Sequence, residues 1–364
     1  MAKLGDCISA AKVQRCGDME YPILSITMKD GIVLQSEKFK KRIASAETSK
    51  YICVPYGKLV QGIHIDEGNF GVQSVVPVGI VSPAYKIWDI NEGVVIPKYI
   101  EMVLRSPRCI EYYRSKLTGT VNRRGRMSTK DFLDMDIPLP DKGTQQRIVD
   151  LMNQVNALMN LRQTEIELID QMVKSRFIEL FGSEAELDRW PCCTIGDVAD
   201  VCVGVVIKPT QYYTDKGIPA FRSLNIGEMR VKDADWVYFT EEGHRKNQKS
   251  VIHKNDVLVV RSGAPGTACV ATEKYEGYNA VDIIIAHPDN RKVNSVFLAA
   301  YTNMPHGMTQ IREKTGGAAQ QHFNVGGYKA MRLIMPPMEL QQRFAAFVEQ
   351  TDKSKLCGEM EVAA

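Results

Sequence analysis

One short segment of this chain combines glycines with three closely spaced arginines. It covers residues 118–126, Thr-Gly-Thr-Val-Asn-Arg-Arg-Gly-Arg. Glycine lets the backbone approach a phosphate group closely, and a guanidinium group can donate two parallel hydrogen bonds to O6 and N7 of guanine. The alternative is an ordinary solvated surface loop. We expect this segment to contact DNA, through Thr118, Gly119, Arg123, Arg124 and Arg126.

A second segment, residues 315–324, begins in a similar way but has different polar side chains. Lys314-Thr315-Gly316-Gly317 matches the pattern Leu117-Thr118-Gly119-Thr120 of the first segment. Amide side chains that follow it can pair bidentately with adenine. A DNA target with two unlike halves requires two segments that share a backbone frame but differ in the side chains that contact the bases. The candidate DNA contacts here are Gln320, Gln321, His322 and Asn324.

Two further groups of basic residues are candidates for contact with DNA. Lys40, Lys41 and Arg42 form a compact cationic run that suits phosphate anchoring, although a charged helix face has the same composition. Arg222 and Arg261 each stand beside an expected strand and next to a serine. These two arginines can face either DNA or an internal carboxylate.

The two glycine-containing segments belong to a longer repeat with an offset of 196 positions. Gln145-Gln146-Arg147 recurs as Gln341-Gln342-Arg343 (341 − 145 = 196), and both follow a proline-containing apolar stretch. Leu4-Gly5-Asp6 likewise matches Ile195-Gly196-Asp197, and Phe132 matches Tyr328. The repeat predicts two related lobes, each followed by a helix. Two such lobes suit a DNA target that is split into two halves.

The charge of the chain is unevenly distributed, although its net value is only +3. Residues 1–143 have 21 Lys and Arg against 16 Asp and Glu (+5), and residues 190–337 have 17 against 14 (+3). Residues 144–189 have 5 against 8 (−3), and residues 338–364 have 3 against 5 (−2). The lobes are therefore mildly basic and suit phosphate, whereas the acidic segments suit protein partners.

The composition is that of a globular protein in a reducing compartment. Hydrophobic residues make up 44% and charged residues 24%. There is no apolar run long enough to cross a membrane and no secretion signal at the start, so we expect a cytoplasmic bacterial or archaeal protein. The nine cysteines form no CxxC pair and the six histidines no HExxH motif. We therefore expect neither a disulfide framework nor a metal site.

The apolar patterns predict an α+β chain of two mixed lobes with strand-rich cores. Strands are expected at residues 21–26, 79–82, 84–88, 256–261 and 280–286, and short helices at residues 98–104 and 296–301. A long helix is expected over residues 145–180, which contain neither Pro nor Gly. Thr144 can cap its start and Gly182 its end. Its apolar stripe is typical of an antiparallel, coiled-coil-like pair, and the helix that follows the second Gln-Gln-Arg is the expected partner.

These features resemble the specificity subunit of type I restriction–modification systems. The resemblance rests on the duplication, on Ile137-Pro138-Leu139-Pro140 ahead of Gln145-Gln146-Arg147, and on the helix that ends in residues 173–182, Val-Lys-Ser-Arg-Phe-Ile-Glu-Leu-Phe-Gly. Residues 217–226 and 256–263 of the second lobe are also similar to the family. The resemblance covers nearly the whole chain.

The resemblance implies a non-catalytic reader of a bipartite target in double-stranded DNA. It implies target-recognition domains at residues 1–143 and 183–337, a central spacer helix at 144–182 and a C-terminal helix at 338–364. The helices would set the spacing and dock two methyltransferase subunits, and motor-nuclease subunits would join for restriction. S-adenosylmethionine and ATP would bind those partners and not this chain. The residues implied on the docking helix are Gln145, Gln146, Arg147, Leu151, Leu158, Ile169, Val173 and Phe177.

Two other classes of function are open to this composition. A fused nuclease of the PD…(D/E)xK type is excluded by inspection, since no lysine has Asp or Glu two positions before it. A fused adenine methyltransferase lacks its (N/D)PP(Y/F) loop, because the single Pro-Pro pair lies between Met335 and Met338. The Walker pattern is absent as well. None of the histidines has an evident nucleophile or base partner. A duplicated protein-binding scaffold is the remaining alternative.

The C-terminal helix departs from the family pattern. It is expected to break off around residues 353–358, well short of the length of the central helix. Residues 166–180 of the central helix would then have no intramolecular partner. Exposed apolar surface there would bind a partner subunit or a second copy of this chain.

Overall fold

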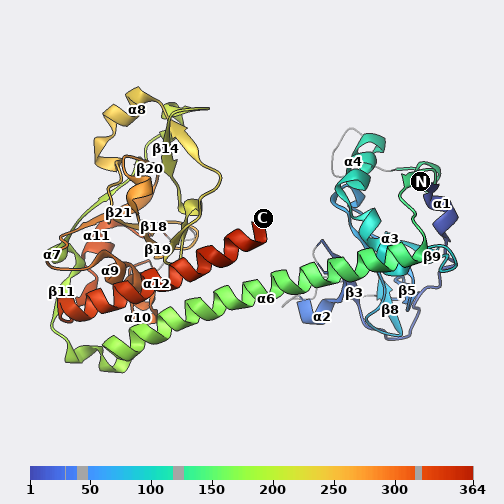
Figure 1. The fold of residues 1–364 in the computed structure, drawn as a ribbon, viewed down its shortest axis with the longest axis horizontal. Helices are drawn as coiled ribbons and strands as arrows, with labels where there is room; N and C mark the ends of the chain where they lie inside the picture. The colour runs from blue at the N-terminus through green and yellow to red at the C-terminus, as the bar shows by residue number, and fades with distance from the viewer. Residues whose placement is uncertain (29, 39–47, 118–126, 316–321, 364) are drawn as a thin grey trace. The chain divides into compact units, whose positions relative to one another are not determined.

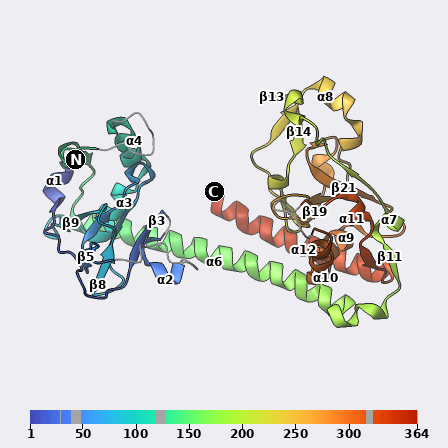
Figure 2. The same ribbon diagram turned by 180° about the vertical axis from the view of Figure 1, so that it is seen from behind.

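The computed structural model describes residues 1–28, 30–38, 48–117, 127–315 and 322–363, with side chains up to residue 353. The chain forms two compact units, Met1–Leu158 and Met159–Ala364. Both units are mixtures of short strands and helices (Figures 1 and 2). The expected fold class is therefore confirmed, and the boundary between the units lies within one long helix.

The first unit is built on a four-stranded antiparallel sheet. Its order is β2 (Ile8–Ala10), β9 (Lys86–Ile90), β6 (Leu59–Gln61), β7 (Phe70–Val72). Alternate side chains of these strands enter two apolar cores: Leu59 and Trp88 on one face, Val60 and Ile87 on the other. The first core is closed by α3 (Pro97–Leu104), α4 (Pro107–Lys116) and α5 (Thr129–Leu133). The second lies against the hairpin β3 (Leu24–Thr27)–β4 (Gly31–Leu34) and the pair β5 (Ile52–Pro55)–β8 (Val78–Val81).

The second unit repeats this plan around the sheet β12 (Ala199–Val203), β21 (Ile283–Pro288), β18 (Val257–Val260), β19 (Ala268–Val270). Residues 283–286 of its strand β21 are apolar because both faces are covered there: Ile284 and Ala286 face one core, Ile283 and Ile285 the other. One core is closed by α9 (Ser295–Asn303), α10 (Pro305–Lys314) and α11 (Val325–Lys329). This unit also has a second sheet: β13 (Tyr213–Thr214), β17 (Val237–Phe239), β14 (Ile218–Phe221), β20 (Asn279–Ala280). The helix α8 (Glu241–Lys246) follows β17.

Each unit opens with the same small motif, which confirms the repeat read from the sequence. A short strand pairs antiparallel with the strand that precedes the long helix: β1 (Ala2–Lys3) with β10 (Asp136–Ile137), and β11 (Cys192–Thr194) with β22 (Arg332–Ile334). One helical turn follows in each, α1 (Leu4–Cys7) and α7 (Ile195–Val198). The carboxylate of its aspartate accepts a backbone hydrogen bond, from Lys3 N to Asp6 (3.1 Å) and from Thr194 N to Asp197 (2.8 Å).

The repeated glutamine fastens each long helix to its own unit. The Gln145 amide oxygen accepts from Ile96 N (2.8 Å), and its nitrogen donates to the carbonyl oxygens of Val94 (3.1 Å) and Pro140 (2.8 Å). The matching Gln341 accepts from Asn294 N (2.9 Å) and donates to the Pro336 carbonyl (2.9 Å). Both side chains are almost completely buried. The expectation that Gln145 lies on a docking surface is therefore wrong, because its polar atoms are used inside the unit.

The central helix α6 covers Lys142–Phe181, a length of about 60 Å at about 1.5 Å per residue. It begins earlier than predicted, because Asp141 and not Thr144 caps it: the Asp141 carboxylate accepts from Thr144 N at 3.0 Å. Its end is the predicted one. Gly182 has a φ of +98° and its N–H donates to the Ile178 carbonyl at 2.8 Å, a conformation that glycine adopts without strain.

The C-terminal half of α6 packs antiparallel to α12 (Met338–Ala363) within the second unit (Figures 1 and 2). The Phe344 ring lies 5.4 Å from that of Phe177 and 5.7 Å from that of Phe181 between centroids, and Val173 shares this core. The expectation that residues 166–180 lack an intramolecular partner is wrong, and Val173 and Phe177 are unavailable for docking. The helix also does not break at residues 353–358, although it remains shorter than α6.

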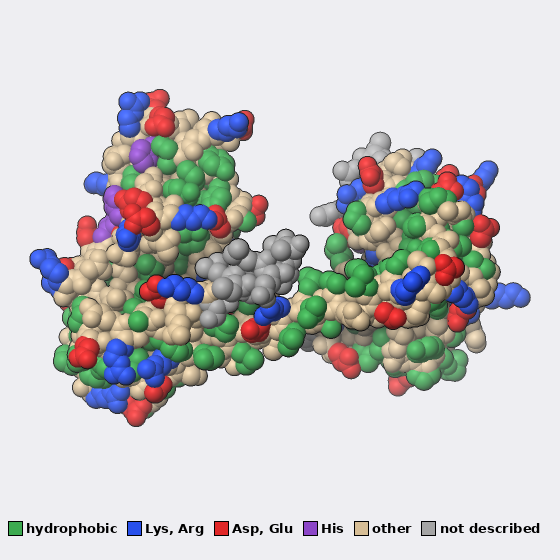
Figure 3. Space-filling view, in the orientation of Figure 1, with side chains coloured by type: hydrophobic (Ala, Val, Ile, Leu, Met, Phe, Trp, Pro, Cys, Tyr) green, Lys and Arg blue, Asp and Glu red, His purple; other side chains and the backbone are tan. Residues whose placement is uncertain are grey.

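The exposed apolar surface of α6 lies in its middle. The most exposed side chains are Leu151 (60%), Leu158 (61%) and Leu161 (63%). Hydrophobic side chains follow one another along this part of the helix in Figure 3. Gln146 and Arg147 are exposed near its start and Ile169 is half-buried. A stripe of this kind on a helix is typical of a surface that packs against another helix.

Candidate nucleic-acid interface

Only four of the predicted DNA contacts lie within the described residues. They are Arg222, Arg261, His322 and Asn324, all in the second unit. The others lie outside the described residues: Lys40, Lys41, Arg42, Thr118, Gly119, Arg123, Arg124, Arg126, Gln320 and Gln321. Their roles stay predictions.

The two loops that hold most of these residues occupy equivalent places in the two units. Residues 118–126 lie between α4 and α5, and residues 316–321 lie between α10 and α11. Buried residues fix the ends of each loop: Met127 in the first unit, and Thr315 and Phe323 in the second. The cores therefore hold the loop ends in a common frame, while the residues between them are free to differ.

Arg261 lies at the end of β18 and is half-buried. Its guanidinium group pairs with the Asp282 carboxylate, and its Nε donates to the Phe323 carbonyl at 3.2 Å. The sequence left open whether this arginine faces DNA or an internal carboxylate, and the structure places it against the carboxylate. Phe323 N also donates to the Arg261 carbonyl at 3.0 Å, so Arg261 holds both backbone groups of Phe323. In this arrangement Arg261 positions the residues that follow segment 316–321.

The structure brings His322 and Asn324 next to Arg261. His322 is exposed, and its Nδ1 lies 2.7 Å from the hydroxyl oxygen of Ser262. The Asn324 side-chain oxygen accepts from Gly327 N at 2.7 Å and so caps α11. Bidentate pairing with adenine needs that same oxygen. Asn324 therefore acts here as a helix cap, and Ser128 has the same role before α5 in the first unit.

Arg222 follows β14 and is tied to its own unit. Its guanidinium group donates to the Asp235 carbonyl, and its backbone N–H donates to the Asn225 side chain at 2.9 Å. The Nε atom is buried and has no hydrogen-bond partner among the described residues. The side chain is half-buried, so the structure gives it a positioning role next to the following turn.

A groove that the sequence did not reveal lies beside this cluster. Its walls are the hairpin β15 (Ile226–Gly227)–β16 (Arg230–Val231) and the turn at residues 260–267. Arg230 and Lys232 line it and are exposed, together with the hydroxyl groups of Ser223, Ser262 and Thr267. Asp170 and Glu228 line the same groove, so its two cations are balanced by two carboxylates and its charge does not by itself favour phosphate. In the sequence the lining residues are scattered between positions 170 and 267, so no local pattern indicates them.

Two further findings bear on function. None of the helices in the described part of the chain is sufficiently long and apolar to cross a membrane. Among the described residues, no group of three His, Cys, Asp or Glu side chains is arranged to hold a metal ion.

Comparison with known proteins gives one relative by sequence. The chain is 22% identical over 253 residues to the specificity subunit of the type I restriction enzyme EcoBI of Escherichia coli. The match covers 62% of this chain and 53% of that protein, so it spans about half the length of the curated relative. No protein-family model matches the chain.

Two solved structures have a similar fold along the whole chain. One is the S subunit of a type I restriction–modification system from M. genitalium, with a TM-score of 0.54, 12% identity and coverage of 100% of this chain and 91% of that chain. The other comes from a study of complex assembly and conformational transition of the type I restriction–modification system, with a TM-score of 0.56, 17% identity and coverage of 100% and 93%. The chain therefore resembles type I specificity subunits in sequence and has their fold, which confirms the resemblance that its motifs indicate.

Proposed function

We propose that this chain is the sequence-reading subunit of a type I restriction–modification complex. Each unit would read one half of a bipartite target in double-stranded DNA. The proposal is supported by the structural repeat: in two units of the same plan, the sequence segments between equivalent helices differ in their polar residues. Such a pair suits two unlike half-sites better than it suits a symmetric target or a single active site.

Catalysis and cofactors would belong to partner subunits. The exposed apolar middle of α6 and its acidic surroundings suit the docking of two methyltransferase subunits, or self-association of the chain. S-adenosylmethionine would bind those subunits, and ATP would bind the motor-nuclease subunits. The segments 1–143 and 183–337 would be the recognition domains, 144–182 the spacer, and 338–364 the C-terminal helix. The chain would act in the cytoplasm.

Binding to a split target tests the proposal directly. The chain would be assembled with its methyltransferase partner, and its target would be read from the methylated positions in the source genome. We expect each wrong base pair in either half-site to cost about 1–3 kcal/mol of binding free energy, measured by titration of labelled duplexes. Indifference to both half-sites would overturn the proposal. Methyl transfer or cleavage by the purified chain alone would favour the enzyme alternative.

Variants of the first loop test which residues read bases. Replacing Arg123, Arg124 or Arg126 by Ala is expected to relax preference in one half-site only, because a bidentate contact discriminates among bases. Arg291 is a matched control, since its side chain is 91% exposed and pairs with Asp289 outside the candidate loops. A loss that is equal for all sequences would assign these arginines to phosphate contact instead.

A further inference from the structure

Three chemically complementary side chains lie on one face of the second unit's sheet. Cys202 belongs to β12 and His287 to the adjacent strand β21. Asp256 directly precedes β18, the next strand of the sheet. In the pairing register Cys202 lies opposite Ile285, and Ile285 lies opposite Leu258. Since side chains on a strand alternate between faces, residues two positions away from this row share its face. This places His287 beside both Cys202 and Asp256.

The three side chains form a continuous relay. The Asp256 carboxylate accepts from Nδ1 of His287 at 2.7 Å, and Nε2 of the same ring lies 3.6 Å from the Cys202 sulfur. The second carboxylate oxygen of Asp256 accepts from the His253 backbone N–H at 2.7 Å. Asp256 is almost fully buried and is therefore fixed, whereas Cys202 and His287 are half-buried. A nucleophile beside a base that is oriented by a third group is the arrangement of activated cysteines.

The electrostatics keep the histidine cationic. The hydrogen bond to Asp256 is the main cause that raises the pKa of the His287 imidazole to about 10, and the contact with Cys202 adds to it, although burial acts the other way. The Lys249 carbonyl accepts a hydrogen bond from the same thiol at 3.2 Å. A charge-assisted hydrogen bond is about twice as strong as a neutral one. The imidazolium, which lies beside the sulfur, is therefore a strong donor to a sulfur anion that departs from this place.

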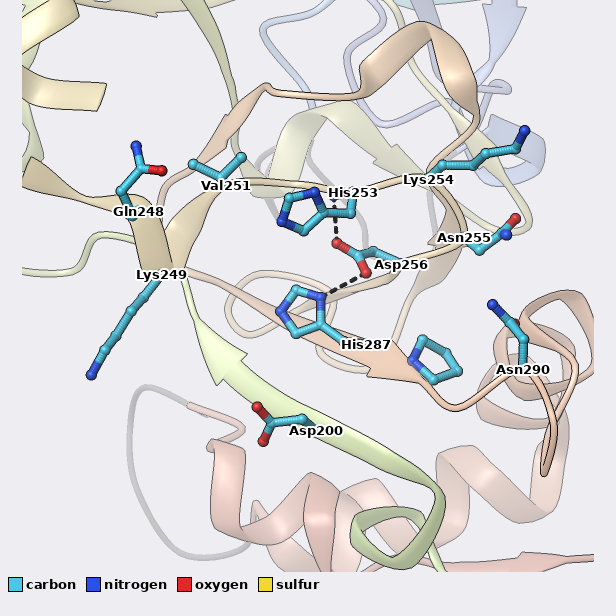
Figure 4. A pocket seen from close by; sticks show the side chains of 11 residues that line it. Asp200, Gln248, Lys249, Val251, His253, Lys254, Asn255, Asp256, His287 and Asn290 are labelled. Atoms are coloured by element: carbon cyan, nitrogen blue, oxygen red, sulfur yellow. Dashed lines mark hydrogen bonds and ion pairs between the residues drawn. The ribbon is translucent and has the colours of Figure 1, made fainter. Parts of the chain in front are cut away.

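His287 and Asp256 line an open pocket at one end of the sheet (Figure 4), and Cys202 lies beside His287 but is not one of the residues that line the pocket. The charged groups around it are Asp200, Lys249, Lys254 and His253, whose ring pairs with Glu276 at 2.8 Å. Asp256 precedes β18, whereas Arg261 and Ser262, which contact Phe323 and His322, follow that strand. The pocket is therefore separate from the candidate DNA interface.

We propose that Cys202 is a covalent modification site, a thiol activated by His287 that exchanges with small disulfides. The Cys202 thiolate attacks one sulfur of the disulfide, and a new S–S bond forms as the original one breaks. The departing thiolate takes the proton from His287 Nε2 and leaves as a thiol. The disulfide is the oxidant, so Cys202 is oxidised by the same two electrons that reduce the departing sulfur. This inference is independent of the proposed role in DNA recognition.

Site-resolved kinetics on the intact chain test the proposal. The protein would be treated with glutathione disulfide at pH 6 and pH 8, and the adduct at each cysteine would be followed by mass spectrometry. An ordinary thiol loses nearly a hundredfold in rate between pH 8 and pH 6, because its thiolate fraction falls with pH. For Cys202 we expect a faster reaction than for comparable cysteines of the chain at both pH values, because the His287 imidazolium donates to the departing sulfur.

Two cysteines of the same chain are internal references. Cys53 and Cys193 are also half-buried, and burial raises the pKa of each thiol. At pH 6 Cys202 is expected to react at least about tenfold faster than either. If Cys202 reacts at the same rate as Cys53 at both pH values, the proposal is overturned.

Variants at two histidines test whether His287 activates Cys202 or whether Cys202 reacts only because it is partly exposed. His287→Gln is expected to slow Cys202 at pH 6 by about tenfold, and to leave the exposed Cys192 unchanged. His253→Gln is the matched control, because this ring lines the same pocket but lies 6.0 Å from the His287 ring and pairs with Glu276. Equal effects of both variants would contradict the relay. If His287→Gln fails to fold, the rates of Cys202, Cys53 and Cys193 in the wild-type chain still decide the matter.

Discussion

At the scale of single residues, two buried glutamines fix the starts of the two long helices. One of them, Gln145, was expected on a docking surface. The Gln145 side chain bonds the backbone of Ile96 and of Pro140, and the Gln341 side chain bonds the backbone of Asn294 and of Pro336. Each of the two prolines lies just before a long helix. A buried amide of this kind fixes the direction in which the chain leaves the lobe. Its repetition at the same place in both units explains why the Gln-Gln-Arg motif recurs.

Replacing Gln145 by Leu should destabilise the first unit by about 2–4 kcal/mol, because it leaves the Ile96 N–H and two carbonyl groups unpaired inside the protein. Hydrogen exchange of peptides from β6 and α3 would measure the local free energy of unfolding. The neighbouring Gln146 is exposed and bonds only Asp150, so Gln146→Leu should change little. Similar effects of the two variants would contradict the role assigned to Gln145.

His306 should make the second unit sensitive to acid. Burial lowers the pKa of His306 to about 4, and its Nε2 has no hydrogen-bond partner among the described residues. Below about pH 6.5 the His306 side chain is protonated in the unfolded chain, whereas in the folded chain it is protonated only at about pH 4 and below. Stability is therefore complete above about pH 6.5 and falls by up to about 3 kcal/mol as the pH drops to about 4.

The variant His306→Phe tests this pH dependence. It keeps the aromatic contact with Tyr301, whose ring centroid lies 4.3 Å away, but cannot be protonated. Urea denaturation at pH 7 and pH 4.5 should show a smaller loss of stability for the variant than for the wild type. His64→Gln in the first unit is the control, since His64 is exposed. An unchanged pH dependence in His306→Phe would mean that other groups cause the acid sensitivity.

At the scale of elements, α6 has two segments with different tasks. Around Phe177 it belongs to the core that it shares with α12, whereas around Leu158 its apolar side chains are exposed. A substitution at Phe177 should therefore act on folding, and one at Leu158 on association. Phe177→Ala is expected to cost about 3–5 kcal/mol of stability, because it opens a cavity among aromatic rings.

Leu158→Glu should leave the fold unchanged and weaken binding to a purified methyltransferase subunit. A charge in the middle of the exposed apolar stripe must be desolvated when a partner covers it. The measurement is a titration by calorimetry or light scattering, with circular dichroism to verify the fold. Gln154→Glu, at an exposed polar position of the same helix, is the matched control. Equal affinities for the wild type and Leu158→Glu would show that the apolar stripe of α6 is not part of the docking surface.

At the scale of the whole molecule, the two units should contribute independently to recognition. Arg123→Ala and the pair Gln320→Ala, Gln321→Ala alter loops in different units, and distant sites are usually additive within about 0.5 kcal/mol. We expect the combined variant to lose the sum of the two separate binding free energies, measured on one bipartite duplex. A coupling energy well above about 0.5 kcal/mol would mean that the loops share one half-site.

The sequence by itself determined the repeat, the α+β class, the bounds of α6 to within three residues and the core strands β9, β18 and β21, but not β2, β6, β7, β12 or β19. These features are local, because apolar periodicity, glycine caps and the absence of proline act within a few residues of the chain. The runs at 283–286 and 257–260 were identified for this reason. The family resemblance followed from the order of such local features.

The tertiary structure alone decided the roles of particular side chains. Arg261 meets Asp282 from 21 positions away, and Cys202 meets His287 from 85 positions away, because strand pairing brings them to one face or one edge of a sheet. The expectation that Phe177 has no intramolecular partner was wrong for the same reason, because its contact with Phe344 of α12 joins positions far apart in the sequence. Sequence patterns indicate which residues are polar, but only the pairing register shows which of them meet.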